Sequence, residues 1–204
     1  FGSDKPDTRF GMEIQDVSEK VKNCGFGVFT SAVENGGSVR AIVVKGGAAK
    51  LSRKEIDRLT EHAKGIGAKG LAFARFVDDQ PNCSFAKFFT PDDLRDLLAS
   101  IDCVKGDVAL FVADKNSVVL PTLGALRVMI AKQLDMIPHG KYNFLWVTEF
   151  PFFEWNEETG HWDAMHHPFT MLNEECLPYL ETDPGKVYAE CYDLVLNGTE
   201  LISG

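Results

Sequence analysis

The character of the sequence changes near residue 137, and this change limits the possible folds. Before it, stretches with the three- and four-residue apolar spacing of helices alternate with short β-rich runs. After it, the chain is aromatic and strand-rich, and Pro138 and Gly140 mark the break. We therefore predict a self-contained α+β unit from about residue 16 to 136. The region after it contains too little helix to cover a sheet, so we expect it to be incomplete in this chain.

Three amphipathic helices are predicted in the first region, near residues 52–65, 91–101 and 121–134. Ser52 and Glu55 have the spacing of a capping box, and Thr90 precedes a proline at the first helical position. The residues predicted to face the core are Ile56, Leu59, Ala63 and Ile66 in the first helix, Leu94, Leu97, Leu98 and Ile101 in the second, and Leu123, Leu126, Ile130 and Leu134 in the third.

The strands of this region are predicted from β-rich runs between turn signals. Phe26–Val33 and Ser38–Val44 are joined by "ENGG", whose Asn-Gly pair is typical of a hairpin. Gly70–Val77 and the almost continuously apolar Asp107–Asp114 are predicted as two more strands. The predicted fold class is α+β, with helices packed on a mostly antiparallel sheet.

The second region has three strand-like runs, "FLWVTEFPFFEW", "HWDAMHHPFT" and "VYAECYDLVLNGTEL". The turn signals "NEETG" and "TDPGK" separate them. We expect these runs to form parts of one antiparallel sheet.

Charge and cysteine content restrict the class of protein. The net charge of −9 argues against binding to nucleic acid or anionic membranes through bulk positive charge, although a local basic patch is still allowed. No apolar run has the roughly 18 residues of a membrane span, and the first residues lack the pattern of a signal peptide. The five cysteines are scattered, as expected for reduced thiols in the cytoplasm. Without an initiator methionine, we interpret the chain as a piece of a longer protein.

Two carboxylates flank the Asn197-Gly198 turn signal near the end of the chain. If the chain reverses there, Val195 opposes Glu200 and Asp193 opposes Ile202, so that Asp193 and Glu200 are diagonal neighbours on one face, about 7–8 Å apart at the backbone. Carboxylates at that separation can share a divalent cation, and Mg²⁺ prefers one or two carboxylates together with substrate phosphates. A solvated hairpin face is the alternative interpretation.

Two adjacent histidines, His166 and His167, lie in "MHHPFTM". Only one of two adjacent strand residues can face a given pocket, and such pairs are commonly structural or exposed. A zinc site made by these histidines with the carboxylates lacks the ligand spacing of known zinc motifs.

Several segments, taken in order, closely resemble bacterial-type aspartyl-tRNA synthetases: "FGSDKPDTRFGMEI", "VKGGAAKLSRKEID", "GAKGLAF", "FLWVTEFPFFEW", "MHHPFTM" and "YDLVLNGTELISG". The resemblance extends over essentially the whole chain. It implies that residues 1–15 flank the class II catalytic domain, residues 16–137 form the GAD insertion domain, and residues 138–204 are a part of the catalytic domain.

The resemblance also implies a function. The full-length enzyme is expected to activate L-aspartate with ATP to aspartyl-adenylate and to transfer the aspartyl group to tRNA. His166 would contact the bound aspartate, with His167 beside it. Asp193 and Glu200 would hold Mg²⁺, and Glu200 would thereby bind ATP. The enzyme is expected to be a cytoplasmic homodimer that does not associate with membranes.

The same resemblance implies missing parts and leaves rival interpretations. Motif 2, motif 3 and the arginine that pairs with the substrate carboxylate would lie outside this chain, so we expect the fragment to be inactive. "TELISG" also differs from the glycine-rich form common in the family. The alternatives are a stand-alone GAD binding module that contacts tRNA or protein, a GAD-bearing amidotransferase subunit, and a metal-dependent hydrolase built on His166, Asp193 and Glu200.

Overall fold

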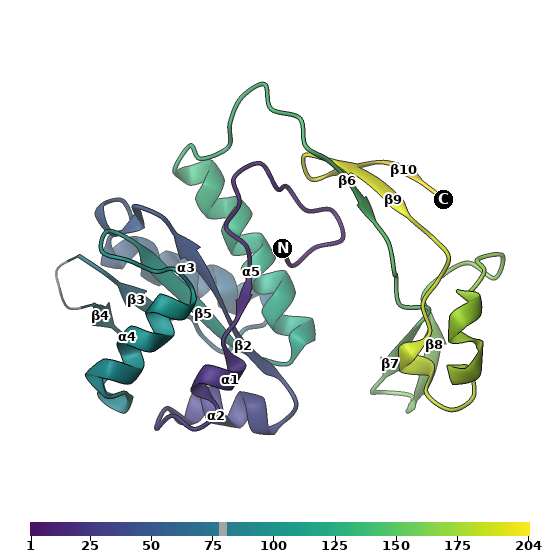
Figure 1. Cartoon of the computed structure of the whole chain (residues 1–204), viewed down its shortest axis with the longest axis horizontal. Coiled ribbons are helices and arrows are strands. Elements are labelled where there is room, and N and C mark those ends of the chain that lie inside the picture. The colour runs from purple at the N-terminus through teal and green to yellow at the C-terminus, as the bar shows by residue number, and fades with distance from the viewer. Residues whose placement is uncertain (78–80) are drawn as a thin grey trace. The chain divides into compact units, whose positions relative to one another are not determined.

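The computed structural model describes residues 1–77 and 81–204, and the chain in it forms two compact units (Figure 1). The first unit comprises Phe1–Ser3 and Thr8–Gly140, and the second comprises Asp4–Asp7 and Lys141–Gly204. The segment 1–15, predicted as a flank of the catalytic domain, is therefore divided between the two units.

The first unit contains a five-stranded sheet in the order β1-β2-β5-β3-β4. Every pairing in it is antiparallel, and the central pair runs in continuous register from Ser38 opposite Asp114 to Val44 opposite Val108. This confirms the predicted antiparallel character of the sheet. The strands are β1 (Gln15–Asp16), β2 (Ser38–Val44), β3 (Ala72–Arg75), β4 (Asn82–Cys83) and β5 (Val108–Asp114).

Helices cover both faces of this sheet (Figure 1). One core lies between the sheet and helices α3 and α5, and the other lies between the sheet and α1, α2 and α4. Ile42 of β2 belongs to the first core and Ala41 to the second. Burial on both sides explains why β2 and β5 are apolar at nearly every position. The helices are α1 (Ser18–Val21), α2 (Gly27–Glu34), α3 (Arg53–Ile66), α4 (Pro91–Ser100) and α5 (Asn116–Gln133), with short 3-10 turns at η1 (Gly47–Ala49) and η2 (Ala86–Phe88).

The predicted helix caps are confirmed. The Ser52 hydroxyl accepts a hydrogen bond from the Glu55 amide, and the Thr90 hydroxyl accepts one from the Asp93 amide.

Two details of the helices differ from the prediction. Ile66 is 37% exposed rather than buried, because α3 ends there, beyond the residues that α5 and the sheet cover. Helix α5 begins at Asn116 and not, as predicted, near Pro121. Pro121 therefore lies inside the helix, where it has no amide hydrogen to donate to the carbonyl of Ser117.

The prediction that Phe26–Val33 is a strand paired with Ser38–Val44 in a hairpin is wrong. Residues Gly27–Glu34 form helix α2, and only Ser38–Val44 is a strand. Phe26, Phe29 and Val33 are three and four residues apart, and all three pack into the core shared with α1 and α4. The aromatic and β-branched composition of this segment obscured a helical spacing.

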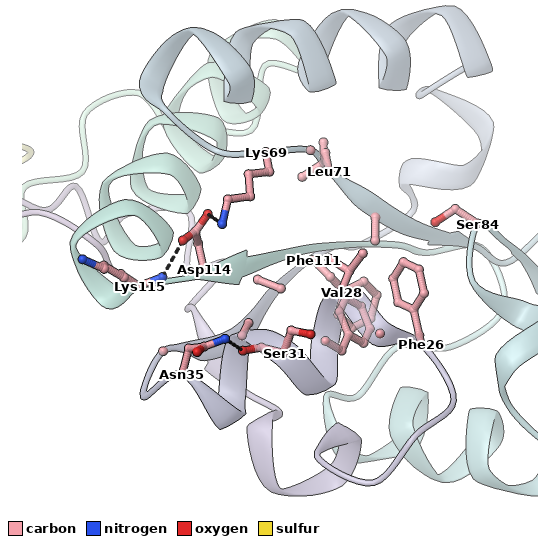
Figure 2. A pocket seen from close by; sticks show the side chains of 17 residues that line it. Phe26, Val28, Ser31, Asn35, Lys69, Leu71, Ser84, Phe111, Asp114 and Lys115 are labelled. Carbon is pink, nitrogen blue, oxygen red and sulfur yellow. Dashed lines mark hydrogen bonds and ion pairs between the residues drawn. The ribbon is translucent and has the colours of Figure 1, made fainter.

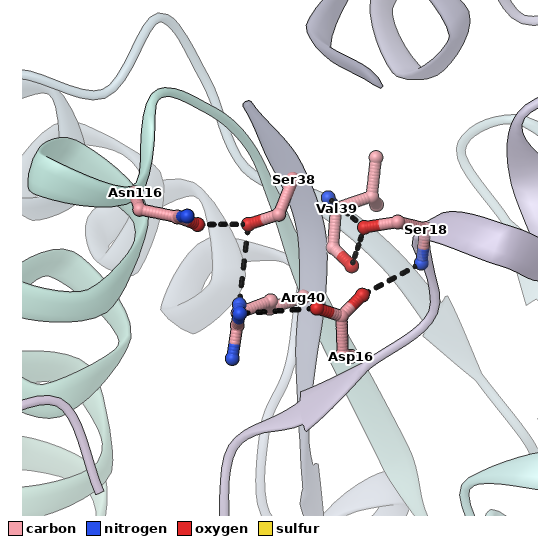
Figure 3. A network of polar contacts seen from close by, with 6 residues as sticks. All are labelled: Asp16, Ser18, Ser38, Val39, Arg40 and Asn116. Carbon is pink, nitrogen blue, oxygen red and sulfur yellow. Dashed lines mark hydrogen bonds and ion pairs between the residues drawn. The ribbon is translucent and has the colours of Figure 1, made fainter. Parts of the chain in front are cut away.

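A polar network fastens β2 to its neighbours (Figure 3). The Arg40 guanidinium lies 3.0 Å from the Asp16 carboxylate of β1 and also donates to the Ser38 hydroxyl. Ser38 in turn donates to the Asn116 side chain at the start of α5, over 2.6 Å. This network joins the edge strand β1, the adjacent strand β2 and helix α5.

A buried arginine holds the first residues of the chain on the first unit. Arg127 of α5 lies between the rings of Phe1 and Phe10, 4.6 and 4.4 Å from their centroids. It also donates hydrogen bonds to the carbonyls of Gly11 and Met12. Stacking and hydrogen bonding together satisfy a cation that would otherwise be costly to bury.

The second unit contains two small sheets where one was predicted. Strands β10, β9 and β6 form an antiparallel sheet, and β7 and β8 form a hairpin. The run "FLWVTEFPFFEW" is divided because Glu149 has a left-handed φ of 59° and Pro151 has no amide hydrogen to continue a ladder. The elements are β6 (Phe144–Val147), β7 (Phe153–Asn156), β8 (His161–Ala164), β9 (Asp193–Leu196) and β10 (Thr199–Ser203), with 3-10 turns at η3 (Glu174–Tyr179) and η4 (Pro184–Lys186).

Candidate functional site

The predicted turn at Asn197-Gly198 is confirmed. Both residues have positive φ, 53° and 85°, as a tight turn between two strands requires. The Asn197 side chain also fixes the turn to the segment that leads into β6, because it accepts from the Asn143 amide and donates to the Lys141 carbonyl, each over 3.0 Å. The turn is thus held both by backbone conformation and by side-chain hydrogen bonds.

The register of this hairpin is confirmed next to the turn and wrong farther from it. Val195 opposes Glu200 as predicted, but Asp193 opposes Ser203 instead of Ile202. The register shifts between Glu200 and Ile202, because Leu201 is an additional residue on β10. Asp193 and Val195 are the buried positions of β9, and Glu200 pairs directly with Val195. The two carboxylates therefore lie on the same face of the hairpin despite the bulge.

Asp193 and Glu200 share an environment that the sequence did not predict. Asp193 is only 8% exposed, which is unusual for a carboxylate. The Lys5 ammonium lies 2.8 Å from a carboxylate oxygen of Glu200. The hydrogen bond and charge of Glu200 raise the pKa of Lys5, and the charges of Asp4 and Asp193 raise it further. Lys5 was missed because it lies almost the whole length of the chain away from its partners.

The two histidines lie in a turn after β8 rather than on a strand. The His166 Nε2 atom is 3.0 Å from the Pro151 carbonyl, and its ring contacts those of Phe150 and Phe152 edge-on. Because a carbonyl only accepts, Nε2 carries the hydrogen, and Nδ1 is the atom left to contact a ligand. His167 is exposed and its Nδ1 atom accepts from the Phe169 amide.

The residues of the hydrolase hypothesis are not gathered into one metal-binding cluster. Within residues 1–77 and 81–204, no three or more histidine, cysteine, aspartate or glutamate side chains meet in a way that could hold a metal ion by themselves. His166 therefore does not complete a set of three protein ligands with Asp193 and Glu200. The acidic pair offers two carboxylates, which suits a cation that takes its remaining ligands from water and phosphate.

A cavity of the first unit contains none of the predicted site residues (Figure 2). It has a volume of about 940 Å³ and lies between α2 and the end of β5. It forms because β3 begins only at Ala72, opposite Phe111, so that among the described residues no strand pairs with the last residues of β5 on that side. Apolar side chains such as Phe26 and Val28 line it, and the ion pair of Lys69 with Asp114, at 3.5 Å, lies at its rim.

No helix in the described part of the chain is both long enough and apolar enough to cross a membrane.

Comparisons with known proteins agree with these observations. Residues 29–123 match the GAD domain, and this range runs from α2 into α5. The whole chain is 59% identical to an aspartate–tRNA ligase of Agathobacter rectalis. It is 56% and 54% identical to aspartate–tRNA(Asp/Asn) ligases of Lachnoclostridium phytofermentans and Anoxybacillus flavithermus. In each case all of this chain is covered, and the chain spans 34% of the relative's length. The chain thus matches the GAD domain over residues 29–123 and is similar over its whole length to aspartate–tRNA ligases, of whose length it spans about a third.

Proposed function

We propose that the chain is part of an aspartate–tRNA ligase that activates L-aspartate with ATP to aspartyl-adenylate and then transfers the aspartyl group to tRNA. The identity of 59% to a protein of that name, over all of this chain, is the observation that carries the proposal. Residues 16–137 are then the GAD insertion domain, residues 138–204 are a part of the class II catalytic domain, and residues 1–15 connect to it. The intact enzyme is a cytoplasmic homodimer.

Asp193 and Glu200 are the proposed Mg²⁺ ligands. Their common face on the β9–β10 hairpin and the burial of Asp193 support this role. The two carboxylates fit Mg²⁺, which takes few protein ligands and completes its shell with water and phosphate oxygens. Bound there, Mg²⁺ would neutralise charge on the ATP phosphates. Asp193 would supply an oxygen from a buried side chain, and Glu200 would supply one from the paired strand β10.

His166 is the proposed contact to the aspartate substrate. Its Nε2 atom is engaged by the Pro151 carbonyl, so the ring presents Nδ1. An imidazolium donates from that atom to a carboxylate, and such charge-assisted hydrogen bonds are the strong ones. Phe150 and Phe152 fix the plane of the ring. His167 lies beside it and shapes the turn through its bond with the Phe169 amide.

The test uses the full-length enzyme. Glu200→Gln removes one charge at nearly constant shape, and we expect aspartate-dependent exchange of pyrophosphate into ATP to fall by about 10²–10³, or about 2.7–4 kcal/mol. Additional Mg²⁺ should recover part of the activity. Glu154→Gln, on the exposed side of β7, is the matched control and should retain activity. Unchanged exchange in Glu200→Gln would mean that the acidic pair is only a solvated face.

His166→Ala distinguishes the two halves of the site. We expect it to raise the aspartate concentration needed for half-maximal exchange and to leave the Mg²⁺ dependence as in the parent enzyme. The 204-residue chain alone should show no exchange, because the chain spans only about a third of its relatives. Exchange that follows the purified chain through successive columns would contradict this.

A further inference from the structure

Lys5 lies on the acidic pair that the proposed function assigns to Mg²⁺. Its ammonium is 2.8 Å from Glu200, and the charge of Asp193 also acts on it. Both carboxylates and the lysine belong to the second unit, although Lys5 comes from the start of the chain. An ammonium and a divalent cation compete for the same carboxylate oxygens.

The backbone around Lys5 is fixed against the hairpin turn. Pro6 and Asp7 are buried, and the Asp7 Cβ lies 3.3 Å from the position that a Cβ on Gly198 would take. The Lys5 carbonyl is 3.7 Å from the same position. Proline also restricts the backbone at that point. The Lys5 backbone therefore lies beside the turn, and its partly exposed side chain reaches Glu200 from there.

We propose that Lys5 is a positioning residue that occupies the acidic pair when no metal is bound and is displaced by the divalent cation. This inference rests on the proposed function of Asp193 and Glu200. With Lys5 in place the acidic pair carries a net charge of about −1 instead of −2, so repulsion between the carboxylates is reduced and metal binding is weakened. The Lys5–Glu200 pair is partly exposed to water, and such pairs are weak enough to be exchanged readily.

The experiment measures the affinity of the 204-residue chain for Mn²⁺, the paramagnetic substitute for Mg²⁺, by titration followed by electron paramagnetic resonance. Lys5→Met should bind Mn²⁺ about three- to tenfold more tightly than the parent chain, because the competing charge is gone. Lys5→Arg should keep the parent affinity. Lys186→Met is the matched control, since Lys186 forms a similar ion pair of 2.7 Å with Asp183 in the same unit.

The outcomes separate this inference from the function on which it rests. A merely structural lysine would leave metal affinity unchanged or lower it on substitution, so equal or weaker binding by Lys5→Met overturns the inference. If Glu200→Gln still abolishes binding in that case, the metal assignment stands. Equal gains in Lys5→Met and Lys186→Met would show an effect of net charge and would also overturn it. Absence of Mn²⁺ binding to every variant would overturn the inference and the metal assignment together.

Discussion

Burial suppresses the reactivity of two of the five cysteines. It raises the pKa of the Cys83 and Cys103 thiols to about 12, and the charge of Asp107 adds to the effect on Cys103. At pH 9, a thiol with a pKa of about 12 is roughly one part in a thousand thiolate, whereas an unshifted thiol is about half ionised. We expect iodoacetamide at pH 9 to leave both unlabelled in the folded chain and to label all five in urea. Mass spectrometry of tryptic peptides measures this, and fast labelling of Cys103 in the folded chain would contradict it.

Because the pKa of these two thiols is raised in the folded chain, we expect the free energy of unfolding to depend on pH. Their pKa is higher in the folded chain than in the unfolded chain, so their contribution to stability is complete below about pH 9. It is lost as the pH rises from 9 toward 12, because the unfolded state then ionises first. Urea unfolding at pH 8 and pH 10 should show the loss, and Cys103→Ala should reduce the difference between the two values.

Leu97 is the residue whose burial tests the core assignment most directly. It is fully buried in the core between α4 and the sheet. Leu97→Ala should lower the free energy of unfolding by roughly 2–5 kcal/mol through lost burial and the cavity left behind. Val104→Ala, at an exposed apolar position, should change it by about 0.5 kcal/mol or less. Equal effects in urea unfolding would mean that α4 does not pack as described.

For single residues, the sequence predicted burial or pairing correctly where these depend on spacing along the chain. The buried leucines of α4 follow from three- and four-residue intervals, and Asp193 and Glu200 follow from one turn. Lys5 and Arg127 could not be predicted, because their partners are brought to them by tertiary structure. An isolated lysine or arginine carries no periodic signal that indicates a buried or paired position.

At the scale of elements, helices with caps were predicted best and irregular strands worst. The caps at Ser52 and Thr90 mark the beginnings of α3 and α4 with short, specific patterns. Helix α2 has no side-chain cap, and its phenylalanines favoured the strand interpretation. The bulge at Leu201 has no sequence signature, so the register was predicted only as far as Glu200.

The β9–β10 turn provides a prediction at this scale. Gly198 has a φ of +85°, and a Cβ there would press on Asp7 at 3.3 Å, so Gly198→Ala combines backbone strain with a tight contact. We expect it to lower the stability of the hairpin by about 1 kcal/mol or more. Gly65→Ala is the control, since it lies inside α3 with open space around it and should stabilise by roughly 0.5–1 kcal/mol.

Hydrogen exchange measures the effect of the turn where it is expected. In Gly198→Ala, the amides of Asp193–Leu196 and Thr199–Ser203 should exchange faster, and those of the first unit should not change. Faster exchange throughout both units would instead indicate that the two units unfold together.

For the whole molecule, the change of sequence character near residue 137 lies close to the division at Gly140. The helices that cover the first sheet are encoded within the first unit, so its completeness could be predicted. No α-helix occurs among the described residues of the second unit, and its 3-10 turns are short. The assignment of segment 4–7 to the second unit could not be predicted, since nothing local in "SDKPD" indicates a partner near residue 198.

The distribution of buried side chains predicts that the two units differ in stability. In the described part of the second unit, the buried apolar residues are Pro6, Cys176, Val187, Ala189 and Val195, whereas the first unit has two extensive cores. Large apolar side chains of the second unit are exposed, including Phe169 at 89%, Phe144 at 61% and Trp146 at 60%. A unit of this size with so little burial is marginally stable.

We therefore expect amides of β6 and β9 to exchange with solvent by local opening. They should exchange at least about a hundredfold faster than amides of β2 and β5, which should exchange only on global unfolding of the first unit. Hydrogen exchange followed by mass spectrometry on the 204-residue chain measures both sets at once. Equal protection of the two sets would mean that these apolar side chains of the second unit are covered in solution.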